Sequence, residues 1–279
     1  MRSVAWLAVP ATTVVVALFA VPLALLLLES LRSPGGWTGE GYAAFFGSAY
    51  AWGVVLRTLR LAAMTTFLCL ALAYPAAFAL AASRGWLQSV LLAALLLPLS
   101  LSVIVKAFGW TVLLRGDGAV NLALQALRLT DAPVRLLFTE TGLLIGIVNI
   151  FLPFMVLPIF ASVRQLDPLL PDAAATLGGD PLYRFWRVVL PLTVPGVVAG
   201  VTLVFSLSIA AYVIPTLLMG DAYQTLPTII ATAFLYLQDP RRGSVAGVVL
   251  LALSLLVVAA SVALGRRADG ALGRRAGAR

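Results

Sequence analysis

Long apolar segments without a charged side chain are the feature that most limits how this chain can fold. Six of them occur, and each is long enough to cross the hydrocarbon core of a bilayer, which takes about 20 residues of α-helix. Because lipid offers no hydrogen-bond partners, a spanning backbone must satisfy its own polar groups, as a helix does. We therefore predict an all-α polytopic membrane protein with six transmembrane helices, at residues 4–28, 61–82, 86–105, 141–163, 188–220 and 243–265.

The composition supports this class and excludes others. Of the 279 residues, 62% are hydrophobic and 11% are charged, whereas about 25% of the residues in soluble domains are charged. The net charge of +8 does not indicate nucleic-acid binding, because the basic residues are scattered at the ends of apolar runs. With no histidine and one cysteine, Cys69, the chain lacks the commonest metal ligand and cannot form an intrachain disulfide.

Two of the six segments depart from a simple span. The first is longer than the hydrophobic region of a secretory signal, so we interpret it as a retained span. The fifth is overlong and contains three prolines, which predicts a shorter spanning part near residues 196–214. A further apolar stretch, 226–237, is too short to span, and whether it enters the membrane partway stays open.

An even number of spans places both termini on the same side of the membrane. Basic residues are more frequent in the segments that lie on this side, which predicts that both termini are cytoplasmic. The basic tail, 266–279, contributes most to this bias. The opposite side then holds segment 30–53, with an interfacial helix, and segment 106–140, with a short helix at 120–129.

The cytoplasmic loop 164–190 begins with strong helix signals. Asp167 is a favoured N-cap, and Pro168 is a favoured first helical residue. The glycine pair at 178–179 provides a left-handed stop. These signals predict a short helix at 169–177.

The second half of the loop repeats the pattern. Asp180 and Pro181 form another opening signal, which predicts a second short helix at 182–190, and Pro191 marks its junction with the fifth span. A plain connection between neighbouring helices needs only about 2–8 residues. The organisation of the loop therefore indicates that it docks onto a partner.

The same stretch resembles the signature of binding-protein-dependent ABC importer permeases, E-A-A-x3-G-x9-I-x-L-P. Here Asp172, Ala173 and Ala174 are followed after three residues by Gly178, and after nine more by V-V-L-P, which ends at Pro191. Asp for Glu and Val for Ile are conservative departures. In that family the loop forms coupling helices that fit a cleft in the ATPase subunit, so the resemblance implies an ATPase-coupling role for these five residues.

The resemblance extends beyond the loop. Residues 57–81 resemble the start of the family's transmembrane core, and 103–110, 150–163 and 189–200 resemble the spermidine/putrescine branch. It covers about residues 57–265 and implies a single transmembrane permease domain, 1–279, in a bacterial inner membrane. Iron, thiamine and phosphonate permeases share much of these branch motifs and remain alternatives.

The resemblance implies a non-catalytic subunit that forms half of a translocation pathway. Its solute, most closely a polyamine, would be delivered by a periplasmic binding protein. The other implied partners are a cytoplasmic ABC ATPase dimer and a second permease subunit, homologous or identical. No phosphate-binding G-x4-G-K-[ST] loop occurs, so we expect no cofactor on this chain and expect ATP and magnesium on the partner ATPase.

A few side chains are candidates for the pathway or a gate. Lys106 ends the third predicted span, where it either snorkels at the outer boundary or contacts the binding protein or a gate. Asn149 is an amide within a span and needs a partner in lipid. Phe151, Phe154 and Tyr212 could face a polycation, although most aromatic side chains here are expected to pack in the core.

A stand-alone secondary transporter or channel is the main alternative from another class. Such a protein needs ionisable residues inside its spans for ion coupling, and the six predicted spans contain none. An integral-membrane enzyme is a weaker alternative, because the spans hold no acid pair and the chain shows no nucleophile and base constellation.

Overall fold

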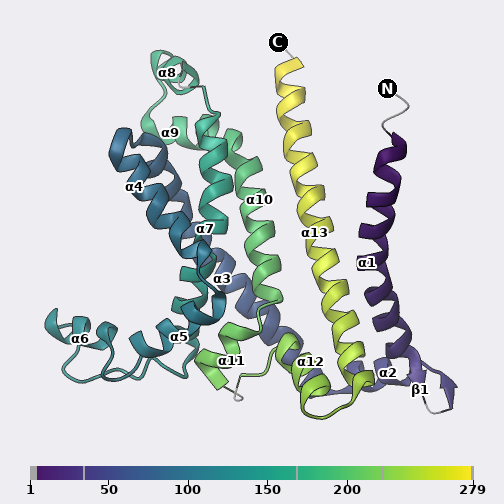
Figure 1. Ribbon diagram of the computed structural model, residues 1–279. Coiled ribbons are helices and arrows are strands. Elements are labelled where there is room, and N and C mark those ends of the chain that lie inside the picture. The colour runs from purple at the N-terminus through teal and green to yellow at the C-terminus, as the bar shows by residue number, and fades with distance from the viewer. Residues whose placement is uncertain (1–4, 34, 168, 221–222, 278–279) are drawn as a thin grey trace. The chain divides into compact units, whose positions relative to one another are not determined.

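The computed structural model describes residues 5–33, 35–167, 169–220 and 223–277. Apart from one short hairpin, the regular structure of these residues is helical (Figure 1). As far as they are described, residues 57–223 and 254–279 form one compact unit, and residues 1–56 and 224–253 form another. The predicted all-α membrane fold is confirmed, and each unit is described by itself below.

Five of the described helices are long and apolar enough to cross a membrane. They are Thr12–Leu31 within α1 (Ala5–Leu31), α3 (Ala49–Ala82), α7 (Glu140–Arg164), Pro181–Ile209, and Pro240–Ala263 within α13 (Pro240–Gly277). A sixth span results only if a bent pair of helices counts as one. This pair joins α4 (Gly85–Leu96) and the 3-10 turn η1 (Leu97–Ser100) to α5 (Val103–Leu113).

The third predicted span, 86–105, is not one continuous helix. The helix directions before and after residues 101–102 differ by 105°. Pro98 lacks a backbone N–H and lies in the 3-10 turn, after which Leu101 becomes extended, with φ −85° and ψ 142°. Ser102 then caps α5, because its Oγ accepts a hydrogen bond from Ile104 N–H at 3.3 Å. Lys106 consequently lies in the first turns of a new helix.

The loop that follows α7 contains one separate helix and not two. The predicted first helix is confirmed as α8 (Leu169–Thr176). The predicted second helix at 182–190 is wrong as a separate element. Instead α9 (Pro181–Arg184) passes through a π-helical turn, η2 (Phe185–Val189), into α10 (Leu190–Ile209).

The π-helical turn explains why Pro191 does not end this helix. Proline removes one hydrogen bond and crowds the preceding turn. In the wider turn, Leu190 N–H donates to Phe185 O, which accommodates the change in pairing before the proline. The helix then ends at Ile209, so the predicted spanning part 196–214 is too long, and α11 (Val213–Met219) is a separate element.

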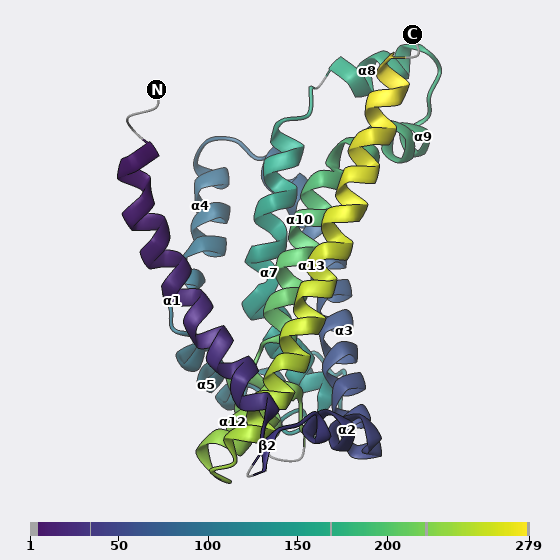
Figure 2. The ribbon, with the colours of Figure 1, turned by 90° about the vertical axis from the view of Figure 1, so that its right-hand side faces the viewer.

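The larger unit is built around α7. Both views show α10 beside it (Figures 1 and 2), and α11 packs against α5 and α7. The helices α7 and α10 approach closely at Gly196 and Gly200, and a Cβ at Gly200 would lie 2.7 Å from Met155 Sδ. Small residues four positions apart allow such packing in membranes, where van der Waals contact drives helix association.

Three predicted short apolar or interfacial segments form helices. Segment 30–53 contains α2 (Glu40–Gly47), and the helix expected at 120–129 is α6 (Ala119–Ala126). The stretch 226–237 forms α12 (Leu226–Leu235), which is too short to span a bilayer as a helix.

A hairpin precedes α2 in the smaller unit. Its strands, β1 (Arg32–Ser33) and β2 (Gly36–Trp37), are antiparallel. The hydroxyl groups of Ser30 and Tyr42 lie 2.6 Å apart and tie the end of α1 to α2. This contact fixes α2 close to the point where the first helix ends.

Candidate functional site

The C-terminus of α8 uses both glycines of the predicted stop. Gly178 has a φ of +84°, and its N–H donates to Ala175 O at 3.0 Å. Gly179 N–H donates to Ala174 O at 2.9 Å. This pair of bonds is a Schellman motif, which satisfies carbonyl groups that a helix end otherwise leaves free. The structure confirms the predicted left-handed stop.

Gly179 carries a steric constraint that the sequence analysis did not assign to it. A Cβ at Gly179 would lie 2.7 Å from Ala174 O and 3.3 Å from Tyr183 Cδ1, whereas a Cβ at Gly178 would meet nothing within 4 Å. Gly178 is therefore needed for its backbone conformation, and Gly179 is needed for space. The presence of a second glycine could have indicated this steric constraint, since one glycine is enough for a left-handed stop.

Polar caps fix the two ends of the loop. Asp167 Oδ1 accepts a hydrogen bond from Leu169 N–H at 2.9 Å, as expected for an N-cap residue, while Pro168 lies outside the described residues. Asp180 Oδ1 accepts from Tyr183 N–H at 2.6 Å and begins α9. Both acidic side chains therefore cap the N-terminus of a helix. These caps set the direction in which α8 projects from the spans.

The coupling residues predicted from the signature lie at the surface. Asp172 and Ala173 are exposed, and Ala174 is half-buried. The loop also exposes apolar side chains, namely Leu169, Leu170, Leu177, Leu182, Tyr183 and Trp186. Leu177 is 89% exposed, at the tip where the helix ends. A short helix with small side chains and an exposed apolar tip is suited to lie in a cleft of another protein.

The base of the loop is connected to α3. The hydroxyl groups of Tyr74 and Thr193 lie 2.9 Å apart, and the Tyr74 ring meets the edge of Phe185 at 5.9 Å between centroids. Pro191 is half-buried at the start of α10. In the sequence it lies between Phe185 and Thr193, the two residues that contact Tyr74. The loop is thus held against two candidate spans, α3 and α10, at the place where it begins to project.

Four of the five predicted pathway residues are wholly or partly buried. Phe151 is buried in the core and meets Phe154 edge-on, with 6.5 Å between ring centroids, so these two aromatics pack together. Lys106 is half-buried in α5, and Tyr212 is half-buried just before α11. The structure brings together Phe151 and Phe154 by a ring contact.

Asn149 differs from the other pathway candidates. It lies on α7 among buried neighbours, yet its own side chain is exposed. Its Oδ1 accepts a hydrogen bond from Trp110 Nε1 at 3.2 Å, which supplies the partner that an amide within a span requires. This pair places an oriented amide on the surface of the larger unit.

A polar cluster that the sequence analysis did not predict lies at the start of α7. The Glu140 carboxylate accepts hydrogen bonds from Arg60 Nη2 at 3.1 Å and from the Tyr223 hydroxyl at 3.3 Å. The Arg57 guanidinium lies 5.5 Å from the centre of the Tyr223 ring. Burial, reinforced by the charge of Glu140, raises the pKa of Tyr223 to about 12, so the phenol stays protonated and donates. A separation of 80 residues between Arg60 and Glu140 hides this cluster from sequence patterns.

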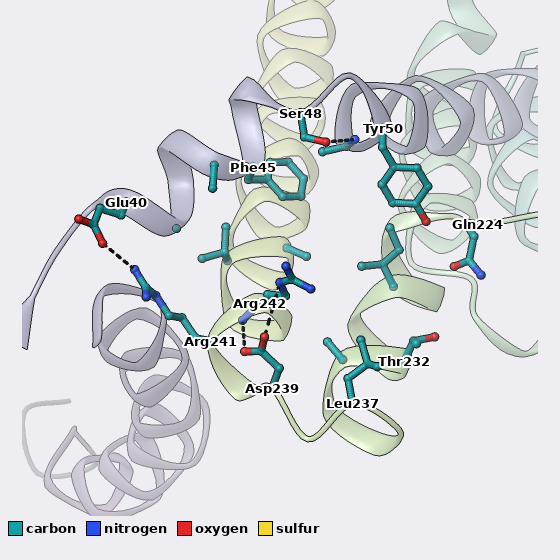
Figure 3. Close-up of a pocket in the computed structure, with 17 residues that line it drawn as sticks. Glu40, Phe45, Ser48, Tyr50, Gln224, Thr232, Leu237, Asp239, Arg241 and Arg242 are labelled. Carbon is teal, nitrogen blue, oxygen red and sulfur yellow. Dashed lines mark hydrogen bonds and ion pairs between the residues drawn. The ribbon is translucent and has the colours of Figure 1, made fainter. Parts of the chain in front are cut away.

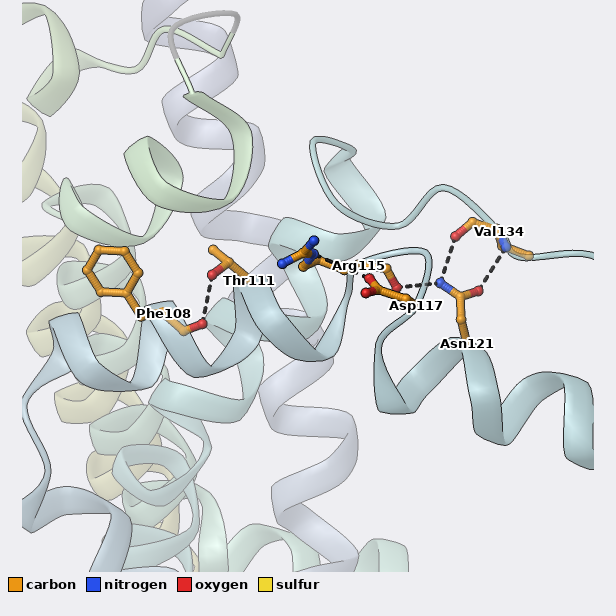
Figure 4. A network of polar contacts seen from close by, with 6 residues as sticks. All are labelled: Phe108, Thr111, Arg115, Asp117, Asn121 and Val134. Atoms are coloured by element: carbon orange, nitrogen blue, oxygen red, sulfur yellow. Dashed lines mark hydrogen bonds and ion pairs between the residues drawn. The ribbon is translucent and has the colours of Figure 1, made fainter.

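The loop between α5 and α7 is organised by one buried amide (Figure 4). Asn121 Nδ2 donates to Arg115 O at 2.9 Å and to Val134 O at 3.0 Å, and its Oδ1 accepts from Val134 N–H at 2.8 Å. Arg115 also pairs with Asp117 at 3.3 Å. Asn121, on α6, therefore joins the backbone at residue 115, after α5, to the backbone at residue 134, before α7.

Comparison with known proteins identifies the family. The family described as "Binding-protein-dependent transport system inner membrane component" matches residues 70–270. The spermidine/putrescine transport system permease protein PotB of Haemophilus influenzae is 33% identical over 221 residues, which cover 79% of this chain and 77% of that protein. The molybdenum transport system permease protein ModB of Mycobacterium bovis is 35% identical over 214 residues, 76% of either chain. This chain belongs to the family of binding-protein-dependent inner membrane permeases, as the resemblance implied.

The solved structures agree at the level of fold. A chain of a bacterial ABC transporter involved in the import of the acidic polysaccharide alginate has a TM-score of 0.78 and 16% sequence identity. The match covers 95% of this chain and 96% of that chain. The helical fold of this chain is thus one already seen in a solved transporter.

Proposed function

We propose that this chain forms half of the translocation pathway of an ATP-driven importer, for a small solute delivered by a periplasmic binding protein. The observation that carries the proposal is the family match over 70–270, which contains the projecting helix α8. The chain lies in the bacterial inner membrane with both termini in the cytoplasm, so α8 projects on the cytoplasmic side. The basic tail supports this orientation.

The proposed partners follow from the family to which this chain belongs. A cytoplasmic ATPase dimer binds ATP and magnesium and supplies the energy, since the sequence of this chain has no phosphate-binding loop of its own. A second permease subunit, homologous or identical, completes the pathway. No catalytic step is assigned to this chain.

In this proposal α8 is the contact with the ATPase. Asp172, Ala173 and Ala174 lie on the docking helix, and Gly178 shapes its end. Pro191 lies where the loop meets α10, next to the contacts of Tyr74 with Phe185 and Thr193. Movement of the docked helix would therefore act on α3 and α10 together, which is what alternating access requires.

A polyamine is the substrate class that we propose first. The sequence motifs of the spermidine/putrescine branch and the similarity to the Haemophilus influenzae protein both support it. Molybdenum transport is the second candidate, because the Mycobacterium bovis protein is similar over a comparable share of the chain. On the surface of the larger unit, Asn149 can orient either kind of solute through its amide, and Lys106 lies half-buried on α5.

The test is ATP hydrolysis by the whole transporter in nanodiscs. The chain is co-expressed with its ATPase, second permease and binding protein, and hydrolysis is measured with spermidine, with molybdate and without solute. Stimulation by spermidine that depends on the binding protein supports the polyamine proposal. Stimulation by molybdate alone would support the importer proposal but would show that the substrate is molybdate and not a polyamine. A chain that copurifies with no ATPase would overturn the proposed coupling role.

A further inference from the structure

A pocket in the smaller unit lies apart from every residue discussed as a coupling or pathway site. It encloses about 580 Å³ and is formed by α2, the start of α3, α12 and the start of α13 (Figure 3). Pockets that hold small ligands usually measure about 300–1,000 Å³. The size alone therefore permits a headgroup-sized ligand.

The lining of the pocket divides into an apolar and a polar part. The apolar residues include Ala44, Phe45, Ile229, Leu237, Val245 and Ala246. The polar residues include Glu40, Ser48, Tyr50, Gln224, Arg241 and Arg242. A ligand that fits both parts has a charged or polar head and at least one hydrocarbon portion.

The charged groups of the lining are two arginines, Arg241 and Arg242, and two carboxylates, Glu40 and Asp239. Arg241 Nη2 lies 3.8 Å from Glu40 Oε2, and the Glu40 side chain is 80% exposed. Arg242 Nε lies 3.5 Å from Asp239 Oδ2, while Asp239 Oδ1 accepts from Arg242 N–H at 3.0 Å. These ion pairs are long or exposed and contribute little to stability, so their members can exchange partners. Within the described residues, Arg241 Nε is buried without a hydrogen-bond partner.

Aromatic side chains indicate the level of the pocket in the membrane. Trp37, Phe46, Tyr50 and Trp52 are all exposed around α2 and the start of α3. Aromatic residues of this kind are enriched at the boundary between hydrocarbon and water. The pocket also lies where the candidate span Thr12–Leu31 ends and where the candidate spans Ala49–Ala82 and Pro240–Ala263 begin, as expected at the level of phospholipid headgroups.

We infer that this pocket binds a zwitterionic phospholipid with a primary amine, phosphatidylethanolamine in particular. Its phosphate is bound by Arg241 and Arg242, because guanidinium groups pair well with phosphate. Its ammonium group donates to Glu40, and one acyl chain lies over Phe45 and Val245. A purely anionic lipid would leave Glu40 next to a like charge. This binding site is independent of the transport substrate.

Native mass spectrometry of the whole transporter, purified from mixed nanodiscs, tests the inference. The nanodiscs contain equal parts of phosphatidylethanolamine, phosphatidylcholine and phosphatidylglycerol, and the lipids retained on the complex are counted. We expect phosphatidylethanolamine to be retained about ten-fold over the other two lipids. R242Q should reduce all retained phospholipid, whereas R115Q, which alters an exposed and paired arginine outside the pocket, should not.

A second variant separates the headgroup interactions. E40L should leave phosphate binding intact and remove the preference for phosphatidylethanolamine over phosphatidylcholine, because leucine cannot accept from the ammonium N–H donors that only the former lipid carries. Preferential retention of phosphatidylglycerol would overturn the inference, as would equal retention in R242Q and the wild type. Crosslinking of the pocket to the binding protein, with no retained lipid, would also overturn it.

Discussion

Gly179 donates its N–H to the carbonyl of Ala174 at 2.9 Å, and the same oxygen would lie 2.7 Å from a Cβ placed on that glycine. The atom that accepts the bond ending α8 is therefore also the atom that a side chain at position 179 would displace. Since α8 is the proposed docking helix, its length and direction depend on this one close approach.

Substitutions at the glycine pair should have different effects. G179A should displace the end of α8, because the added Cβ meets a backbone oxygen that cannot move independently. G178N should be tolerated better than G178V, since asparagine adopts a positive φ at lower cost than a β-branched residue. The measurement is solute-stimulated ATP hydrolysis by the whole transporter. Equal activity of G178N and G178V would contradict the role assigned to the backbone conformation.

The contact between Tyr74 and Thr193 should contribute to stability as a pair. Y74F and T193V each remove one hydroxyl of a 2.9 Å contact, and we expect a loss of about 1 kcal/mol for either change. The double variant should lose less than the sum of the single changes. Thermal unfolding in detergent measures this. T202V is the matched control, because the Thr202 hydroxyl donates to Val198 O within its own helix.

The sequence allowed the helical membrane fold and the first coupling helix to be predicted because their signals are local. Uncharged apolar runs, Asp167 and the glycine pair act on their immediate neighbours. The bend at 101–102 and the continuous helix through Pro191 were missed, since proline can be accommodated by a tighter or a wider turn. The cluster at Glu140 depends on residues brought together only by the fold.

The packing of α10 on α7 should be sensitive to volume at Gly196. A Cβ there would lie 2.5 Å from Pro158 O and would also overlap Ser162, so G196A should destabilise the larger unit by about 1–3 kcal/mol. G109A is the control, because a Cβ at Gly109 meets nothing within 4 Å. Unfolding temperature and monodispersity in detergent provide the measurement, and an equal effect of both changes would refute the close approach.

The loop between α5 and α7 should depend on the amide of Asn121. N121A leaves two carbonyls and one N–H without their partner, at a cost of about 1–3 kcal/mol if they stay buried. Limited proteolysis should then cleave between residues 115 and 134 faster than in the wild type. Q125A, on the same helix, should leave the rate of cleavage unchanged.

The phenol of Tyr223 should make stability depend on alkaline pH. Its pKa is raised to about 12, with burial as the main cause and the charge of Glu140 as the next, so the folded state favours the protonated phenol. A group whose pKa is raised on folding contributes stability that is complete below its unfolded value, about 10, and is lost as the pH rises toward 12. The wild type should therefore lose more stability than Y223F between about pH 10 and pH 12. The measurement is thermal unfolding of both proteins across this range. Taking the difference in stability at each pH cancels the titration of all the groups that the two proteins share. Parallel curves would show that Tyr223 ionises as freely in the folded protein as in the unfolded chain.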